Sequence, residues 1–350
     1  MVKRRIPAPR NILMSYHYFK DYDLDRVPNL TIIGDSGAFS AKSQGATITT
    51  KELAEWAKQW RHRLKWVAAL DVIGNPVATY SNWREMVDIH GVEAVPTIHY
   101  GTHPSELDKY ARRGVDLVGL GGLVRVPTGA QMRWLIQVFK YAAKHHPDMQ
   151  FHGWGCTSAA HFRLPFYSVD SSSWTSGVRY GQARLVDPRT GKQVAYKLDG
   201  REAYRPGIAR LLSEVYGVSP RDASYSNASN REVMVRIHAL AESAREQWWR
   251  GKHGPARVPS WGVNPAAVRA DQRAEHLAVS AGSDVEKIND IGAGDRSVHL
   301  ATTGPYFPQL DRMAGEEGAG DRSIHLATAR ISNASPEALE DVFYPTEEQQ

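Results

Sequence analysis

The first 180 residues alternate short apolar segments with amphipathic segments of helical spacing, and this alternation constrains the fold more than any other feature. Strands are expected over 11–15, 30–34, 66–71, 94–99, 116–120, 150–154 and 166–170. Helices are expected over 50–64, 79–90, 104–113 and 128–145, and several of them follow a Thr or Ser that can cap the first turn. Repeated strand–helix units place successive strands parallel through right-handed connections. The sequence therefore predicts an α/β protein built on a parallel sheet.

Polar residues stand where several of these strands end, which favours a closed (β/α)₈ (TIM) barrel over an open doubly wound sheet. Barrels collect their chemistry at the carboxyl ends of many strands. No glycine-rich dinucleotide or phosphate loop connects a strand to a helix. After residue 180 the pattern indicates a hairpin over 182–198 and helices over 202–216 and 230–249, which close or cover the barrel. We therefore expect a TIM barrel over residues 1–250 with a C-terminal helical and irregular extension.

The last hundred residues differ from the rest in charge and in pattern. Residues 1–250 hold 34 Lys and Arg against 23 Asp and Glu, whereas residues 251–350 hold 9 against 15. The segment GAGDRSVHLAT at 292–302 returns as GAGDRSIHLAT at 318–328. Two copies are too few for a solenoid. We expect residues 251–350 to form an acidic C-terminal extension, with the duplicated segment either a small appendage or a partly ordered tail.

The basic balance of residues 1–250 is typical of a polyanion-binding protein, although a merely soluble basic surface gives the same count. A single cysteine, Cys156, excludes an internal disulfide and any cysteine-rich zinc or iron–sulfur cluster. The 14 histidines show no metal-binding spacing, so no metal site is expected. No apolar segment approaches the roughly 20 residues of a membrane helix, and no apolar region follows the basic N-terminus. We expect a cytoplasmic protein without membrane contact.

Two carboxylates follow expected strands that lie far apart in the sequence. Asp35 follows the strand over 30–34, and Asp170 ends the strand over 166–170. Other expected strand ends carry Asp71, His99, Gly121 and Gly122. Paired carboxylates suit displacement at an anomeric carbon, where one attacks as a nucleophile and the other moves protons. Aspartates at strand ends are equally common as helix caps or loop anchors.

Five short segments carry a family resemblance. They are DSGAFS at 35–40, ALDV at 69–72, GLGGL at 119–123, HGWGCTS at 152–158 and VDSSSW at 169–174. In this order, each at an expected strand end, they resemble the tRNA-guanine transglycosylase superfamily, and most closely its phage and bacterial DNA-guanine transglycosylases. The resemblance covers about residues 11 to 180, and it implies a TIM barrel.

The resemblance also implies roles for individual residues. Asp170 matches the nucleophile that attacks C1′ of the target nucleoside, and Asp35 matches the carboxylate that serves as general acid and base. Asp71 matches the aspartate that reads the Watson–Crick edge of the purine, whose N1–H and 2-amino group are donors. Gly121 and Gly122 match a Gly-Gly pair whose backbone approaches the base, an approach that a Cβ would obstruct.

The sequence departs from the tRNA-acting enzymes in two respects. His99 stands where those enzymes use a glutamine, and the cysteines of their structural zinc site are missing. Phe39 and Tyr100 follow site residues and are expected to stack on the base. Arginines that follow the late strands are expected to contact the nucleic-acid backbone; they are Arg125, Arg163, Arg179 and Arg184.

The resemblance implies a DNA-guanine transglycosylase that exchanges guanine in DNA for a free 7-deazaguanine such as preQ0. Its partners are DNA with a flipped-out guanine and the free base, and it needs no cofactor because one N-glycosidic bond replaces another. The resemblance suggests a phage or mobile-element origin, which places the enzyme in a host cytoplasm. Three alternatives remain open: the same exchange on tRNA, a catalytically silent nucleic-acid-binding barrel, and an unrelated TIM-barrel hydrolase. The oligomeric state is left open.

Overall fold

The computed structural model describes residues 6–171, 181–198, 200–224, 231–254, 256–264 and 297–302. The chain divides into two compact units. The larger unit contains residues 11–171 and the described residues between 253 and 301. The smaller unit contains residues 6–10, the described residues between 181 and 252, and Thr302.

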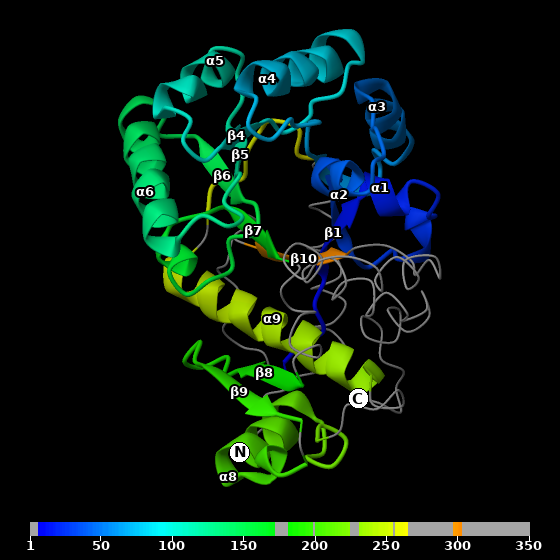
Figure 1. The fold of residues 1–350 in the computed structure, drawn as a ribbon, viewed down its shortest axis with the longest axis vertical. Helices are drawn as coiled ribbons and strands as arrows, with labels where there is room; N and C mark the ends of the chain where they lie inside the picture. Colours follow the sequence, from blue (N-terminus) through cyan, green and yellow to red (C-terminus); the bar gives the residue numbers. More distant parts are fainter. Residues whose placement is uncertain are drawn as a thin grey trace. The chain divides into compact units, whose positions relative to one another are not determined.

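An eight-stranded sheet forms the centre of the larger unit (Figure 1). Its strands are β1 (Asn11–Ser15), β2 (Thr31–Asp35), β3 (Leu64–Val67), β4 (Thr97–His99), β5 (Leu117–Gly121), β6 (Gln150–Gly153), β7 (Ser168–Ser171) and β10 (Ser297–Thr302). The order in the sheet is β3-β2-β1-β10-β7-β6-β5-β4. Every strand pair whose register is given for this sheet is parallel. The predicted parallel α/β class is thus confirmed.

The two outermost strands of this order are joined at one point. An isolated parallel bridge pairs Ala68, directly after β3, with Val95, two residues before β4. The amide of Val95 donates to the carbonyl of Val67 over 2.8 Å, and the amide of Ala69 donates to the carbonyl of Val95 over 2.8 Å. The end of β3 is therefore hydrogen-bonded to the segment that leads into β4.

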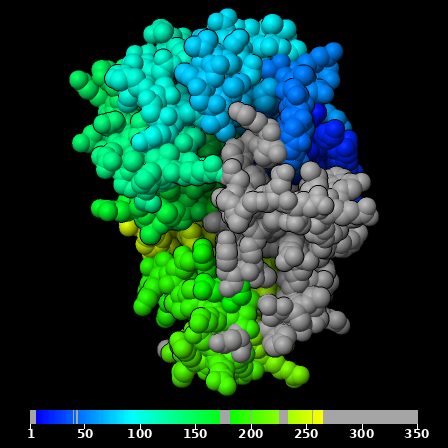
Figure 2. All heavy atoms as spheres, in the orientation of Figure 1, coloured from blue at the N-terminus to red at the C-terminus, as the bar shows by residue number. Residues whose placement is uncertain are grey.

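The helices of this unit lie around the strands (Figure 1), and the described atoms of residues 11–171 are coloured blue to green in Figure 2. They are α1 (Tyr16–Phe19), α2 (Ala38–Ser43), α3 (Thr50–Gln59), α4 (Pro76–Arg84), α5 (Leu107–Ala111) and α6 (Thr128–His145). Short 3₁₀ or π turns are η1 (Leu24–Arg26), η2 (Glu85–Ile89), η3 (Pro104–Glu106) and η4 (His161–Arg163). The helix α3 begins with a capping box between Thr49 and Glu52, as its sequence predicts. The four predicted helices are confirmed, with bounds that shift by a few residues.

The core within the sheet is built from alternate residues of several strands, because side chains along a strand point to opposite faces. Its buried members on the strands and at their ends include Leu13, Ile33, Trp66, Ala68, Val95, Leu117 and Tyr167. Ala256 and Val263 complete this cluster, although they come from the chain after α9. The segment over 256–264, which we call the strap, is therefore part of the sheet core.

Hydrogen bonds fix the strap to the amino ends of the strands. The buried carboxylate of Asp116, one residue before β5, accepts bonds from the amides of Ser260 and Trp261 at 2.9 Å. The amide of Asn264 donates to the carbonyl of Lys65 over 2.8 Å. The predicted division at residue 250 therefore differs from the structure. The apolar residues of the strap are each buried or half-buried, and its short, proline-containing sequence did not reveal this.

The strand β10 lies in the first copy of the duplicated segment. Its register with β7 pairs Ser297 with Ser168 and His299 with Asp170. The sequence predicted an appendage or a tail here, and the structure instead gives this copy a place in the sheet between β1 and β7. The second copy, over 318–328, lies outside the described residues.

The smaller unit contains the antiparallel hairpin of β8 (Gln182–Val186) and β9 (Gln193–Lys197), as predicted. Its helical elements are η6 (Glu202–Tyr204), α8 (Pro206–Leu211), η7 (Leu212–Tyr216) and α9 (Arg231–His253). The apolar faces of the hairpin and of α9 share one buried cluster, which includes Leu185, Tyr196, Met234 and Ile237. Among the described residues of the whole chain, no helix has the length and apolar character that crossing a membrane requires.

Candidate active site

Three of the predicted carboxylates meet at the carboxyl ends of the strands. Asp35 ends β2, Asp71 follows β3, and Asp170 lies in β7. Burial and the nearby charges of Asp71 and Asp170 raise the pKa of Asp35 to about 7. A carboxyl group with this pKa can give or take a proton at neutral pH, which is the property that a general acid and base requires.

The turn after β2 fixes the Asp35 carboxylate. Oδ2 of Asp35 accepts a hydrogen bond of 3.1 Å from the amide of Gly37. Gly37 has a φ of 72°, and a Cβ at this position would lie 2.3 Å from Oγ of Ser15. Only glycine adopts this φ without strain and also leaves room for the Ser15 hydroxyl. The DSG segment therefore keeps its glycine for a local structural reason that is independent of substrate binding.

The raised pKa of Asp35 predicts a pH-dependent stability. The folded protein holds this proton up to about pH 7, whereas the unfolded chain releases it near the usual pKa of 3.8. Because the folded state binds the proton more tightly, this group lowers the stability progressively as the pH rises between these values. Asp35→Asn removes this effect, so its gain in unfolding free energy should be about 4 kcal/mol larger at pH 8 than at pH 4.

Urea unfolding at both pH values measures this difference. The matched control is Asp148→Asn, because the carboxylate of Asp148 is 78% exposed. A gain from Asp35→Asn that is the same at both pH values would contradict the assignment of the raised pKa.

Asp71 and His99 form a pair across the ends of β3 and β4. Nε2 of His99 lies 2.7 Å from Oδ2 of Asp71, and the His99 side chain is only 7% exposed. The sequence predicted both residues at this edge but not their contact. The structure thus supplies one carboxylate oxygen and one imidazole in a fixed arrangement, and Asp71 keeps a second oxygen that can accept bonds from a ligand.

Asp170 is held from the adjacent strand β6 and from the loop that follows it. Oδ1 of Asp170 accepts a hydrogen bond of 2.9 Å from the amide of Gly155. Nε2 of His152 lies 3.3 Å from the same oxygen. His152 is fully buried, and burial lowers its pKa although the nearby Asp170 opposes this change. The imidazole is therefore neutral at neutral pH.

The predicted glycine pair makes room for neighbouring side chains. A Cβ on Gly121 would lie 3.0 Å from Cδ1 of Trp154, and a Cβ on Gly122 would lie 3.1 Å from Cβ of His99. Gly122 also has a φ of 70°. Close packing against His99 and Trp154 is therefore one physical reason for glycine at these positions, and it adds to the predicted approach of a base.

Two residues of this site were missed by sequence reasoning. His152 and Trp154 both lie beside the carboxylate cluster, with their ring centroids 4.3 Å apart. The sequence contained part of the information that would have found them. His152 lies in β6 and Trp154 directly follows it, and β6 is the strand that precedes β7 in the sequence. The neighbouring strand β5 contains Gly119 and Gly121, and a tryptophan ring commonly packs over such glycines. The ring of Trp154 does so here.

The remaining predicted residues lie in different surroundings. The ring of Tyr100 packs edge-on against Trp134 of α6, with centroids 5.9 Å apart, and the residue is exposed. Arg125 and Arg163 are exposed in the larger unit. Arg184 lies in β8 of the smaller unit. The side chain of Phe39 and the whole of Arg179 lie outside the described residues.

Cys156 is fully buried next to this site, as the sequence predicted. Burial and the charge of Asp170 raise the pKa of its thiol far above the usual value, so it is not a thiolate nucleophile. In the part of the chain that the structure describes, no three His, Cys, Asp or Glu side chains are grouped so that they could hold a metal ion.

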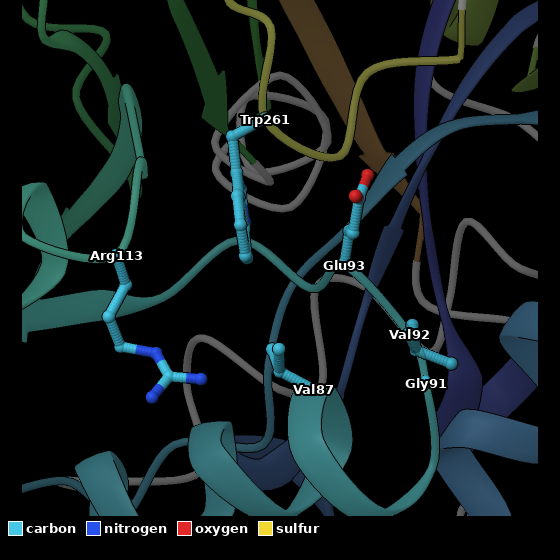
Figure 3. A pocket seen from close by; sticks show the side chains of 6 residues that line it. All are labelled: Val87, Gly91, Val92, Glu93, Arg113 and Trp261. Carbon is cyan, nitrogen blue, oxygen red and sulfur yellow. The ribbon is translucent and has the colours of Figure 1, made fainter.

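A separate pocket of about 500 Å³ lies near the opposite end of the sheet (Figure 3). Its lining is Val87, Gly91, Val92, Glu93, Arg113 and Trp261. Val92 and Glu93 come shortly before β4 and Arg113 before β5, so the pocket belongs to the amino ends of these strands. None of the predicted catalytic or base-binding residues lines it.

No protein-family model matches the chain, and no curated protein matches it in sequence at a significant level. The fold and the site nevertheless define a class: a parallel α/β protein with a cluster of three interacting carboxylates at the carboxyl ends of its strands. Such clusters are typical of sites for acid–base or covalent chemistry.

Proposed function

We propose that this protein is a DNA-guanine transglycosylase, which replaces guanine in DNA by a free 7-deazaguanine such as preQ0. The observation that carries the proposal is the electrostatic contrast between two carboxylates. The pKa of Asp35 is raised to about 7 by burial, Asp71 and Asp170. Asp170, in contrast, receives an amide hydrogen bond and faces a neutral imidazole. Different environments for two neighbouring carboxyl groups support a division into an acid–base group and a nucleophile.

The chemistry proceeds in two displacements. The Asp170 carboxylate attacks C1′, its new C–O bond forms, and the bond from C1′ to N9 of guanine breaks. Asp35 gives its proton to the departing guanine. The incoming base then loses a proton to Asp35, and its N9 displaces Asp170 from C1′. The two inversions retain the configuration at the sugar, and Asp35 ends with its original proton count.

The pair of Asp71 and His99 and the ring of Trp154 support recognition of a planar base. The Asp71 carboxylate is an acceptor for the N1–H and 2-amino donors of guanine and of 7-deazaguanines. Trp154 is half-buried, and its indole Nε1 is held 3.0 Å from Oγ1 of Thr97. A ring fixed in this way offers a face on which a flipped-out base can stack.

DNA is favoured over tRNA on two sequence observations. The cysteines of the zinc site found in the tRNA-acting enzymes are missing, and His99 replaces their glutamine. The excess of basic residues over 1–250 supports contact with a polyanion without distinguishing the two nucleic acids.

The same proposal includes a closed (β/α)₈ barrel. The bridge between Ala68 and Val95 joins the two outermost strands of the sheet order, and β10 occupies the position between β1 and β7. These two observations support closure of an eight-stranded parallel sheet on itself.

Incorporation of radiolabelled guanine or preQ0 tests the proposed function, with double-stranded DNA and tRNA offered in parallel to the full chain. We expect label in DNA and none in tRNA. Label in tRNA alone would identify the tRNA-acting activity, and release of guanine without incorporation would identify a hydrolase. Binding of DNA without either reaction would identify a silent barrel.

A further inference from the structure

We propose that His152 is a positioning residue that holds Asp170 by Oδ1, so that Oδ2 is the atom that attacks the sugar. The inference rests on the proposed transglycosylase function. His152 does not touch the substrate, because its side chain has no exposed surface. Its effect is therefore exerted through Asp170.

Two nitrogen atoms approach one oxygen of Asp170, and the Gly155 amide makes a hydrogen bond to it, whereas the contact of His152 Nε2 lacks the geometry of a hydrogen bond in this structure. Nε2 of His152 lies 3.3 Å from Oδ1, and the amide of Gly155 donates to Oδ1 over 2.9 Å. Among the described residues, no hydrogen bond reaches Oδ2. The carboxylate is thus oriented by Oδ1 and presents Oδ2 as its reactive atom.

The other side of the imidazole determines which nitrogen carries the proton. Nδ1 of His152 lies 2.7 Å from Oγ of Ser168, two residues before Asp170 on β7. A neutral imidazole has one N–H, and a carboxylate oxygen can only accept. We assign the proton to Nε2, because an unprotonated ring nitrogen 3.3 Å from a carboxylate oxygen would be repelled by it, and Nδ1 then accepts from the hydroxyl of Ser168.

This arrangement contains a serine, a histidine and an aspartate, but it is not a serine-hydrolase triad. Ser168 is fully buried, so its hydroxyl cannot reach a substrate. The two ring nitrogens are also exchanged relative to such a triad, because Nδ1 of His152 faces the serine and Nε2 faces the aspartate. The order of these three residues makes the aspartate the group that is prepared for attack.

Aromatic rings fix the orientation of the imidazole. The ring of Trp66 lies edge-on to His152 with centroids 4.9 Å apart, and the ring of Trp154 does so at 4.3 Å. The backbone of His152 is paired with Ser168 in the register of β6 and β7. Because ring and backbone are both fixed, the donor at Nε2 has a single direction.

The proton balance of the reaction does not involve His152. The bond from Oδ2 of Asp170 to C1′ forms while the bond from C1′ to N9 breaks, and Asp35 supplies the proton to guanine. The imidazole stays neutral throughout. The titratable groups that act on Asp170 or Asp35 in the described site are His152, Cys156 and Asp71, in addition to these two carboxyls themselves.

Two substitutions of His152 separate positioning from packing. The amide nitrogen of glutamine reaches the position of Nε2, whereas that of asparagine reaches only the position of Nδ1. We expect His152→Asn to lower kcat of base exchange by about 100-fold, the scale of a misplaced reacting group, with little change in KM. We expect His152→Gln to recover most of that loss. If His152 only fills space, the two variants will lose activity in parallel with their thermal stability, and the proposal is overturned.

Nitrogen-15 NMR of the histidine rings gives a readout that does not need activity. We expect the wild-type His152 ring to be neutral at pH 7 with its proton on Nε2, assigned by comparison with His152→Gln. A proton on Nδ1, or a charged ring, would overturn the inference whatever the exchange assay shows. If the wild-type protein has the proton on Nε2 but does not exchange bases, the proposed function is contradicted. The attacking role of Oδ2 is then contradicted with it.

Discussion

Replacement of Asp170 by asparagine is expected to abolish base exchange, with a fall in rate of about four orders of magnitude or more. The amide retains an oxygen that can accept the hydrogen bond from Gly155, so the local structure is preserved. It cannot form the covalent bond to C1′, because a neutral amide is a poor nucleophile. The folded state should not lose stability, since the change removes one charge from a cluster of three carboxylates.

The measurement combines label exchange into DNA with intact-mass detection of a protein–DNA adduct. The matched control is Asp148→Asn, the same substitution at an exposed position outside the site. It should exchange base at the wild-type rate. An Asp170→Asn protein that still forms the adduct would place the nucleophile elsewhere and contradict the proposed mechanism.

A chain that ends at His253 is expected not to fold into a soluble larger unit. This truncation keeps the predicted barrel region over 1–250 but removes the strap and β10. The buried Asp116 then loses the amides of Ser260 and Trp261, and the core loses Ala256 and Val263. The loss of this apolar burial and of these hydrogen bonds costs several kcal/mol, which is comparable with the whole stability of many domains.

The comparison is a chain that ends at Thr302, which retains the strap and β10. We expect this longer chain to be soluble and to unfold cooperatively, whereas the shorter one should aggregate through its uncovered core and open strand edges. Size-exclusion chromatography and circular dichroism distinguish the two. Cooperative unfolding of the shorter chain at the wild-type temperature would contradict the role assigned to the strap.

The elements that sequence predicted well are those whose pattern is local. The strand over 11–15, the hairpin over 182–198 and the helix over 128–145 have the predicted bounds, or nearly so, because periodicity and turn residues are read within one segment. The strand β10 was missed because glycine and charged residues surround it, and its partners β1 and β7 lie more than 120 residues away.

In the candidate site, too, sequence predicted the features that depend on local pattern and missed those that depend on long-range contacts. The sequence predicted that Asp35, Asp71 and Asp170 lie at strand ends, since each follows or ends an apolar segment. It did not predict that His99 binds Asp71 or that His152 faces Asp170, because these contacts depend on which strands are neighbours and on their register. The burial that raises the pKa of Asp35 likewise exists only in the folded chain.

The place of β10 in the sheet has a consequence for synthesis on the ribosome. Translation delivers β1 and β7 long before residue 302, so each of these strands waits with one unpaired edge. At about 5–20 residues per second, the interval between β7 and β10 is on the order of 10 s. During that time the nascent chain presents two adjacent open edges of the same sheet, which other chains can pair with. Efficient production of this protein therefore depends on shielding the nascent chain until its last strand is made.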